Sequence, residues 1–260
     1  MTYVLTDSAT MVRRNLKRMV RYPSMTLQLM LLPVIFLLLF VYVFGGTLGA
    51  GIGGPAGGRA EYLNYVTPTI VLMAITAAVQ GTSISIAMDM TGGIVDRFRT
   101  MAIARVSVLT GHVVGSLVQT VLAMSLVFGV AVAIGFRPRA NLAEWLALAG
   151  LLVAMAFALI WFSAALGLVS KSVESSSNVG TPMLLLPFFG NGFVPTDSMP
   201  AALRWFAEYQ PFTPFIAALR GLLMGTPIGN NGYIALGWCA IIGFGGYFWS
   251  KKLFNRESTR

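Results

Sequence analysis

The chain alternates between long apolar blocks and short polar ones. Six stretches contain no Asp, Glu, Lys or Arg: 22–58, 62–88, 106–136, 145–170, 175–196 and 221–250. A membrane helix needs about 20 mostly apolar residues to cross a hydrocarbon core of roughly 30 Å. The pattern therefore predicts six transmembrane helices. The fifth stretch is the least apolar, because it opens with four polar residues and contains Pro182 and Pro187, but we still expect it to span.

The segment 7–21, before the first apolar stretch, has the pattern of an amphipathic helix. Apolar residues recur at helical spacing at Val12, Leu16, Met19 and Val20, and basic residues fill the positions between them: Arg13, Arg14, Lys17, Arg18 and Arg21. Such a pattern predicts a helix that lies in the membrane interface, and Pro23 then turns the chain into the first span. A disordered basic leader is the alternative.

The glycine-rich segment 45–58 lacks bulky side chains, so we expect a flexible loop on the external side. The region 191–228 is interrupted too often by proline and charge to span. Local signals there favour two short helices: Ser198 caps the first, with Pro200 in its first turn, and Thr213 caps the second, with Pro214 as its first residue and Gly225 as its end.

Together, the two predicted helices form a hairpin on the external side that we expect to be partly embedded in the membrane. The second is apolar enough to dip into the outer leaflet, through Phe215, Leu219, Leu222 and Leu223. A plain external loop is the alternative, since charged residues are costly at membrane depth and the region contains Arg204, Glu208 and Arg220.

Composition supports a membrane protein. Hydrophobic residues make up 56% of the 260 positions and charged residues 10%, against about 25% charged residues in soluble domains. The net charge of +9 follows the predicted topology, because the basic residues cluster before span one, between spans two and three, after span four and after span six. The other side has only Arg59, Arg137, Arg139, Arg204 and Arg220. Positive charge collects on the cytoplasmic side, so both termini are expected in the cytoplasm, and no nucleic-acid partner is expected.

The N-terminal apolar run is longer than the core of a signal peptide, so we expect an uncleaved first helix. The single cysteine, Cys239, rules out an intramolecular disulfide.

The sequence lacks the motifs of an ATPase or a metalloenzyme. No G-x-x-x-x-G-K-[ST] loop occurs, so we do not expect the chain to hydrolyse ATP by itself. His112 is the only histidine and no cysteine cluster exists, so no metal site is expected, and His112 is interpreted as a polar interface residue. The middle of each predicted span has no ionisable residue, in contrast to ion-coupled carriers. Energy must then come from outside the membrane, or the protein is passive.

The cytoplasmic loop 89–105 contains a short amphipathic stretch. Ile94, Phe98 and Met101 form an apolar edge at helical spacing, and Asp96, Arg97 and Arg99 flank it. Such an edge fits the groove of a cytoplasmic partner. A simple positively charged loop is the other interpretation.

Short motifs along the whole chain resemble the membrane subunits of type-2 ABC exporters, and within them the daunorubicin-resistance type of permease. They are Arg13-Arg14-Asn15-Leu16, Tyr22-Pro23, Tyr42-Val43-Phe44-Gly45-Gly46, Asp96-Arg97-Phe98-Arg99, Phe193-Val194-Pro195, Met199-Pro200, Gln210-Pro211-Phe212-Thr213-Pro214 and Ala218-Leu219-Arg220-Gly221-Leu222-Leu223. The chain departs from the pattern at Ala102, where proline is common, and at His112, where a basic residue is common.

The resemblance implies a role for three segments. Segment 7–21, with Arg13, Arg14, Leu16, Lys17 and Arg18, corresponds to the interfacial connecting helix. Segment 89–105 contains the coupling helix that docks on an ATPase, with Asp89, Gly92, Ile94, Asp96, Arg97, Phe98, Arg99 and Met101 as candidate residues. Segment 196–225 is the external re-entrant region, with Pro200, Pro211, Pro214 and Arg220.

We therefore expect an all-α integral membrane protein that forms one permease domain over residues 1–260, with six transmembrane helices, an N-terminal interfacial helix and an external re-entrant hairpin before the last span. The resemblance implies a multidrug efflux permease of the bacterial cytoplasmic membrane that pairs with itself or a close homologue and with two copies of an ABC ATPase. ATP and magnesium would bind to that ATPase, and no catalytic residue or cofactor is expected in this chain. An exporter of a lipid or a lipid-linked glycan is the first alternative, and a passive membrane scaffold is the second.

Overall fold

The computed structural model describes residues 2–21, 23–53, 58–93 and 105–256, and these residues contain helices and no strand. The long helices are α1 (Thr2–Arg21), α2 (Pro23–Leu39), α4 (Arg59–Thr91), α6 (Arg105–Ala133), α7 (Leu142–Val169) and α11 (Asn231–Arg256). The shorter helices are η1 (Phe40–Phe44), α3 (Gly45–Gly53), α8 (Val173–Leu185), η3 (Leu186–Phe189), η4 (Thr196–Ser198), α9 (Ala201–Tyr209) and α10 (Phe212–Met224).

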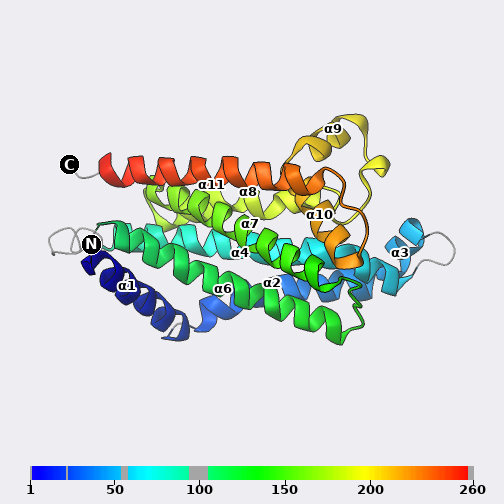
Figure 1. Ribbon diagram of the computed structural model, residues 1–260, viewed down its shortest axis with the longest axis horizontal. Helices are drawn as coiled ribbons and strands as arrows, with labels where there is room; N and C mark the ends of the chain where they lie inside the picture. The colour runs from blue at the N-terminus through cyan, green and yellow to red at the C-terminus, as the bar shows by residue number, and fades with distance from the viewer. Residues whose placement is uncertain (1, 22, 54–57, 94–104, 257–260) are drawn as a thin grey trace.

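The long helices run side by side in a bundle with α4 at its centre (Figure 1). Helix α4 is buried along most of its length, and α2, α6, α7 and α8 all pack against it. Both described ends of the chain lie at one end of the bundle, which we call the N/C end, and α3, α9 and α10 lie at the other, the far end (Figure 1). The outer faces of α2 and α11 are apolar and exposed, as a lipid-facing surface requires.

Five stretches within the described residues are helical, long and apolar enough to cross a membrane: 27–52, 59–91, 109–133, 142–169 and 231–254. The fifth predicted span, 175–196, has a different form. Helix α8 has 13 residues and continues directly into the four-residue 3-10 helix η3, so the two together rise about 27 Å. Pro187 and Gly190 end the regular helix there, which explains why this stretch looked weakest in the sequence.

The glycine-rich segment after the first span was wrongly predicted as a loop in its first half. Helix α2 passes through the π-helical turn η1 into α3, which remains helical to Gly53. Helix α3 packs on the start of α4, where a Cβ on Gly49 would lie 2.3 Å from the carbonyl oxygen of Gly58. Glycine at this position therefore lets the two backbones touch, and that packing stabilises a helix which composition alone does not favour.

The hairpin before the last span has two short helices, as predicted, and protein covers the apolar side of the second helix. The apolar residues of α10, including Phe215, Leu219 and Leu223, are buried against α4, α7 and α11. Gly225 ends α10 in the left-handed conformation at φ 65°. The last span accordingly begins at Asn231, later than the predicted 221.

The predicted caps of this hairpin are also different. The Ser198 hydroxyl donates to the carbonyl of Pro195 and leaves α9 uncapped by a side chain, and Pro200 precedes the helix. The Thr213 hydroxyl donates to the carbonyl of Ala207, and α10 begins at Phe212 after Pro211. Thr213 therefore links the two helices of the hairpin instead of starting the second.

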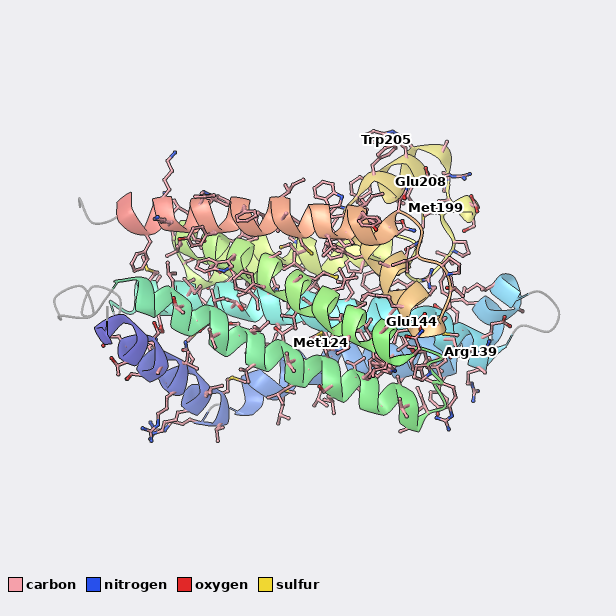
Figure 2. All side chains as sticks on the ribbon, in the orientation of Figure 1. Met124, Arg139, Glu144, Met199, Trp205 and Glu208 are labelled. Atoms are coloured by element: carbon pink, nitrogen blue, oxygen red, sulfur yellow. The ribbon has the colours of Figure 1, made fainter. Side chains whose placement is uncertain are left out.

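Two side chains fix the beginning of α7. Asn141 and Glu144 form a capping box, in which each side chain accepts a hydrogen bond from the backbone of the other residue. The amide of Arg139 donates to the carbonyl of Leu223 at 2.9 Å, and Figure 2 shows Arg139 and Glu144 close to the end of α10. The loop between α6 and α7 thus holds α10 against the bundle.

Candidate functional site

Helix α1 lies on α6 at two positions where α6 has glycine. Met11 and Asn15, one turn apart, are the buried residues of the side of α1 that faces α6. A Cβ on Gly111 would lie 2.5 Å from Cβ of Met11, and a Cβ on Gly115 would lie 2.9 Å from Cβ of Asn15. The spacing Gly-x-x-x-Gly places both glycines on one face of α6, which lets α1 approach closely.

Next to this contact, a buried carboxylate joins three helices. Nη2 of Arg14 on α1 donates to Oδ2 of Asp89 on α4 at 2.6 Å, and Nε2 of His112 on α6 lies 3.1 Å from the same oxygen. The side chains of Asp89 and His112 are each 4% exposed, whereas that of Arg14 is 32% exposed. Because a buried charge is costly without partners, removing one of these groups disturbs the contact between all three helices.

Asp89 lies two residues before the end of α4, and the chain leaves α4 through Gly92 and Gly93. The amide of Gly92 donates to the carbonyl of Met88, and Gly93 takes a φ of 67° that favours glycine. The direction in which the chain enters the predicted coupling segment is therefore set within one helical turn of Asp89.

The structure describes some of the residues that were predicted for the coupling segment and for the interfacial helix. Asp89 and Gly92 belong to the end of α4, and six further candidates lie outside the described residues: Ile94, Asp96, Arg97, Phe98, Arg99 and Met101. On α1, Arg13 and Lys17 are exposed and Leu16 is half-buried, and the side chain of Arg18 lies outside the described part. Of the predicted residues, the structure thus brings together Arg14 and Asp89.

At the far end, Arg220 of α10 holds the chain that follows η3. Its guanidinium donates to the carbonyl of Asn191 at 2.9 Å and to that of Tyr65 at 3.3 Å, and it stacks 3.6 Å from the centroid of the Tyr65 ring. The Tyr65 hydroxyl donates to the same Asn191 carbonyl at 2.8 Å. Carbonyl acceptors and an aromatic face explain how an arginine is accommodated in this apolar region.

The other α4 contacts of this segment are also hydrogen bonds from side chains to the backbone. The Thr69 hydroxyl donates to the carbonyl of Gly192 at 2.9 Å, and that of Tyr62 to the carbonyl of Phe193 at 3.4 Å. The ring of Phe193 stacks on Phe188 at 4.6 Å and lies 4.4 Å from Phe40 of η1. This aromatic cluster connects the end of the first span with η3.

Arg204, the other arginine of the hairpin, forms an exposed ion-pair group on α9. It contacts Asp197 and, at 2.9 Å, Glu208. The hydrogen bond with Glu208 and the charge of Asp197 raise the pKa of Arg204 above its ordinary value. Figure 2 shows Glu208 and Trp205 on the part of the hairpin that projects from the bundle.

Helix α8 is attached to α4 by small polar side chains. The hydroxyls of Ser83 and Ser176 lie 2.6 Å apart, and Nε2 of Gln80 donates to the carbonyl of Ser177 at 3.3 Å. Ser163 of α7 donates to the carbonyl of Val79. These serines form hydrogen bonds between helices, and Ser176 belongs to the polar run that weakened the fifth predicted span.

Within the described ranges, no group of three or more His, Cys, Asp or Glu side chains could hold a metal ion. The hydrogen bonds of Asp89 with Arg14 and His112 connect α1, α4 and α6. Sequence reasoning missed the role of His112, which is buried against Asp89. It also missed Gly111 and Gly115, although their Gly-x-x-x-Gly spacing was visible in the sequence.

Comparison with known proteins gives a consistent match. A family model described as "ABC-2 type transporter" matches residues 7–224. The chain is 29% identical over 208 residues to the daunorubicin resistance ABC transporter permease protein DrrB1 of Streptomyces coeruleorubidus, which covers 79% of this chain and 70% of the relative. It is 26% identical over 162 residues to the probable doxorubicin resistance ABC transporter permease protein DrrC of Mycobacterium tuberculosis, which covers 61% of this chain and 59% of that relative.

Proposed function

The chain belongs to the ABC-2 type transporter family, and from this premise we propose that it is the membrane-spanning permease subunit of an ATP-driven exporter of hydrophobic or amphipathic compounds. The substrate class rests on similarity to the two permeases named for daunorubicin and doxorubicin resistance. The apolar bundle and the absence of ionisable residues from the middle of its spans support a transport role that is powered from outside the membrane.

One observation supports the coupling mechanism above all others: α1 is bonded to the last turns of α4, directly before the segment that we expect to dock on the ATPase. Arg14 reaches Asp89 at 2.6 Å, and Met11 lies on Gly111. A displacement of segment 94–104 would therefore pull on α1 and α6 as well as on α4. In this proposal ATP binding closes the ATPase dimer, and this contact spreads the movement through the bundle.

The proposed assembly has two permease chains, this one and a second copy or a close homologue, and two ATPase subunits. The N/C end faces the cytoplasm of a bacterial cell across the cytoplasmic membrane, in agreement with the concentration of basic residues at that end. ATP and magnesium bind to the ATPase subunits, because this chain has no phosphate-binding loop. ATP shifts the permease between inward-open and outward-open states only if it binds the two states with different affinity.

Transport in proteoliposomes tests the proposal. Vesicles that contain the permease and its partner ATPase should accumulate an amphipathic cationic drug only with hydrolysable ATP, and collapse of a proton gradient should leave the uptake unchanged. Uptake that follows an imposed pH gradient without ATP would instead identify a secondary carrier. ATP-dependent movement of a lipid-linked sugar without drug uptake would favour a lipid or glycan exporter.

A further inference from the structure

Helix α1 presents a row of basic side chains that the contacts described above do not use. Arg13, Lys17 and Arg21 follow one another at intervals of four residues, and all three are exposed. We call them the basic stripe. At 100° per residue Arg13 and Lys17 lie on the side of α1 opposite to Met11 and Asn15, which are buried against α6, and Arg21 lies on the flank between the two sides. Arg13 and Lys17 therefore point away from the bundle, and Arg21 is exposed at its edge.

Apolar side chains lie directly beside the basic stripe. Val20 is 82% exposed, and Leu16 is half-buried on the same flank. Water alone is a poor environment for a valine side chain that is this exposed and lies beside the cations of the basic stripe. A membrane interface suits both, because apolar side chains enter the acyl region while lysine and arginine stay among the headgroups.

The position of α1 also indicates lipid. Arg21 lies six residues before Leu27, where the first membrane-spanning stretch begins, which is about 9 Å along a helix. The headgroup layer on each side of the hydrocarbon core is roughly 5–8 Å thick. Figure 1 shows α1 slanting from the N/C end to its junction with α2 at the periphery of the bundle. The stripe thus ends beside the membrane, away from the end of α4 where the coupling segment begins.

We propose that the basic stripe binds the anionic headgroups of phospholipids in the leaflet at the N/C end, and that this binding holds α1 in the position in which Arg14 contacts Asp89. The proposal rests on the proposed orientation of the chain in the membrane. Adjacent residues of one helix then have separate tasks: Arg14 faces Asp89 within the protein, while Arg13 and Lys17 face the lipid. Lipid composition would in this way set how firmly α1 is attached to α4.

A labelled permease without its ATPase tests this binding directly. A fluorescent dye is attached at Val20→Cys in a Cys239→Ser background, and the protein is reconstituted in phosphatidylcholine vesicles. The quenching of the dye by a small fraction of nitroxide-labelled phosphatidylglycerol is compared with quenching by nitroxide-labelled phosphatidylcholine. We expect severalfold stronger quenching by the anionic lipid, and we expect high salt to reduce the difference.

A matched pair of variants shows whether the stripe is responsible. Lys17→Gln with Arg21→Gln should remove the preference for phosphatidylglycerol, since each basic charge at an anionic surface contributes about fivefold to binding. Lys251→Gln with Lys252→Gln removes two exposed charges from the same end of the bundle on α11 and should leave the quenching ratio unchanged. Lys17→Arg with Arg21→Lys keeps both charges and should retain the preference.

Three results would overturn the proposal. They are equal quenching by the two lipids in the otherwise unchanged protein, an equal loss in the α11 variant, and displacement of the anionic lipid from the dye when the ATPase is added. The last result would assign the basic stripe to the partner protein. Because this measurement needs neither ATP nor transport, a failure of drug export would leave its outcome interpretable.

Discussion

Arg14 and Asp89 lie 75 positions apart in the sequence, and Nη2 of Arg14 donates to Oδ2 of Asp89 at 2.6 Å. The bond joins the helix before the first span to the end of the second span. His112 approaches the same oxygen from the third. If one of these helices moves, either these contacts with Asp89 change or the other two helices move with it. The coupling proposal rests on this connection.

The contribution of this ion pair can be measured with a double-mutant cycle. Arg14→Gln and Asp89→Asn should each destabilise the purified permease, because each leaves a buried polar partner incompletely paired, and the double variant should lose less than the sum. We expect a coupling energy of about 1–2 kcal/mol, below the value for a fully buried pair because Arg14 is one-third exposed. Chemical or thermal unfolding in detergent gives the values, and additive losses would show that the two side chains do not interact.

The close contact between α1 and α6 predicts a strong effect at one glycine and none at another. Gly111→Val should destabilise the protein by about 1–3 kcal/mol and reduce ATP-driven uptake, since the new side chain would push Met11 and α1 away. Gly129→Ala on the same helix has open space around its Cβ and should be neutral or slightly stabilising. Unfolding midpoints in detergent and uptake by proteoliposomes test both variants, and similar losses at the two positions would contradict the contact.

The two arginines of the hairpin should differ in importance. Arg220→Gln should destabilise the permease by about 2–3 kcal/mol, because it removes the partly buried hydrogen bonds to the Tyr65 and Asn191 carbonyls and the stacking on Tyr65. Arg204→Gln removes an exposed ion-pair group and should have little measurable effect. Limited proteolysis of the hairpin, together with thermal unfolding, would distinguish them, and equal sensitivity of both variants would contradict this assignment.

The amphipathic edge of segment 94–101 is predicted from the sequence to dock on the ATPase. Asp96→Arg combined with Phe98→Asp should spare membrane insertion and abolish co-purification of the ATPase, because it removes an apolar anchor and inverts a charge beside it. The double variant Arg137→Gln with Asp197→Asn changes charges at the far end and serves as a control that should keep the complex intact. Normal complex formation by the loop variant would count decisively against docking.

Orientation can be tested with single cysteines in a Cys239→Ser background. Cysteines at Gly53 and Asn230 lie at the far end, at the last residue of α3 and directly before α11, and should react with an impermeant thiol reagent added outside the cell. A cysteine at Ser172, between α7 and α8 at the N/C end, should react only after the membrane is opened. Labelling of Ser172 from outside in sealed cells would overturn the proposed topology.

The sequence by itself determined the class of protein and the order of its main helices, although it predicted six spans, and five helices of the described residues are long and apolar enough to cross a membrane. Long apolar stretches, the amphipathic 7–21 segment and the proline-rich hairpin are local patterns, and the helical periodicity and the cost of charge in lipid act within each segment alone. The motifs that resemble daunorubicin-type permeases also lie within short segments, which is why the family could be recognised before any contact between helices was known.

Only the tertiary structure decided which side of each segment is buried. The apolar pattern of α10 did not indicate that α4, α7 and α11 cover its apolar residues. The sequence placed segment 45–53 in a loop, whereas contact with α4 stabilises it as a helix. Likewise, no spacing in the sequence indicates that His112 faces Asp89, or that Gly111 lies under Met11. Such contacts depend on how whole helices cross, and because hydrophobicity is similar on all sides of a membrane helix, the apolar pattern that predicts the helix is silent about its neighbour.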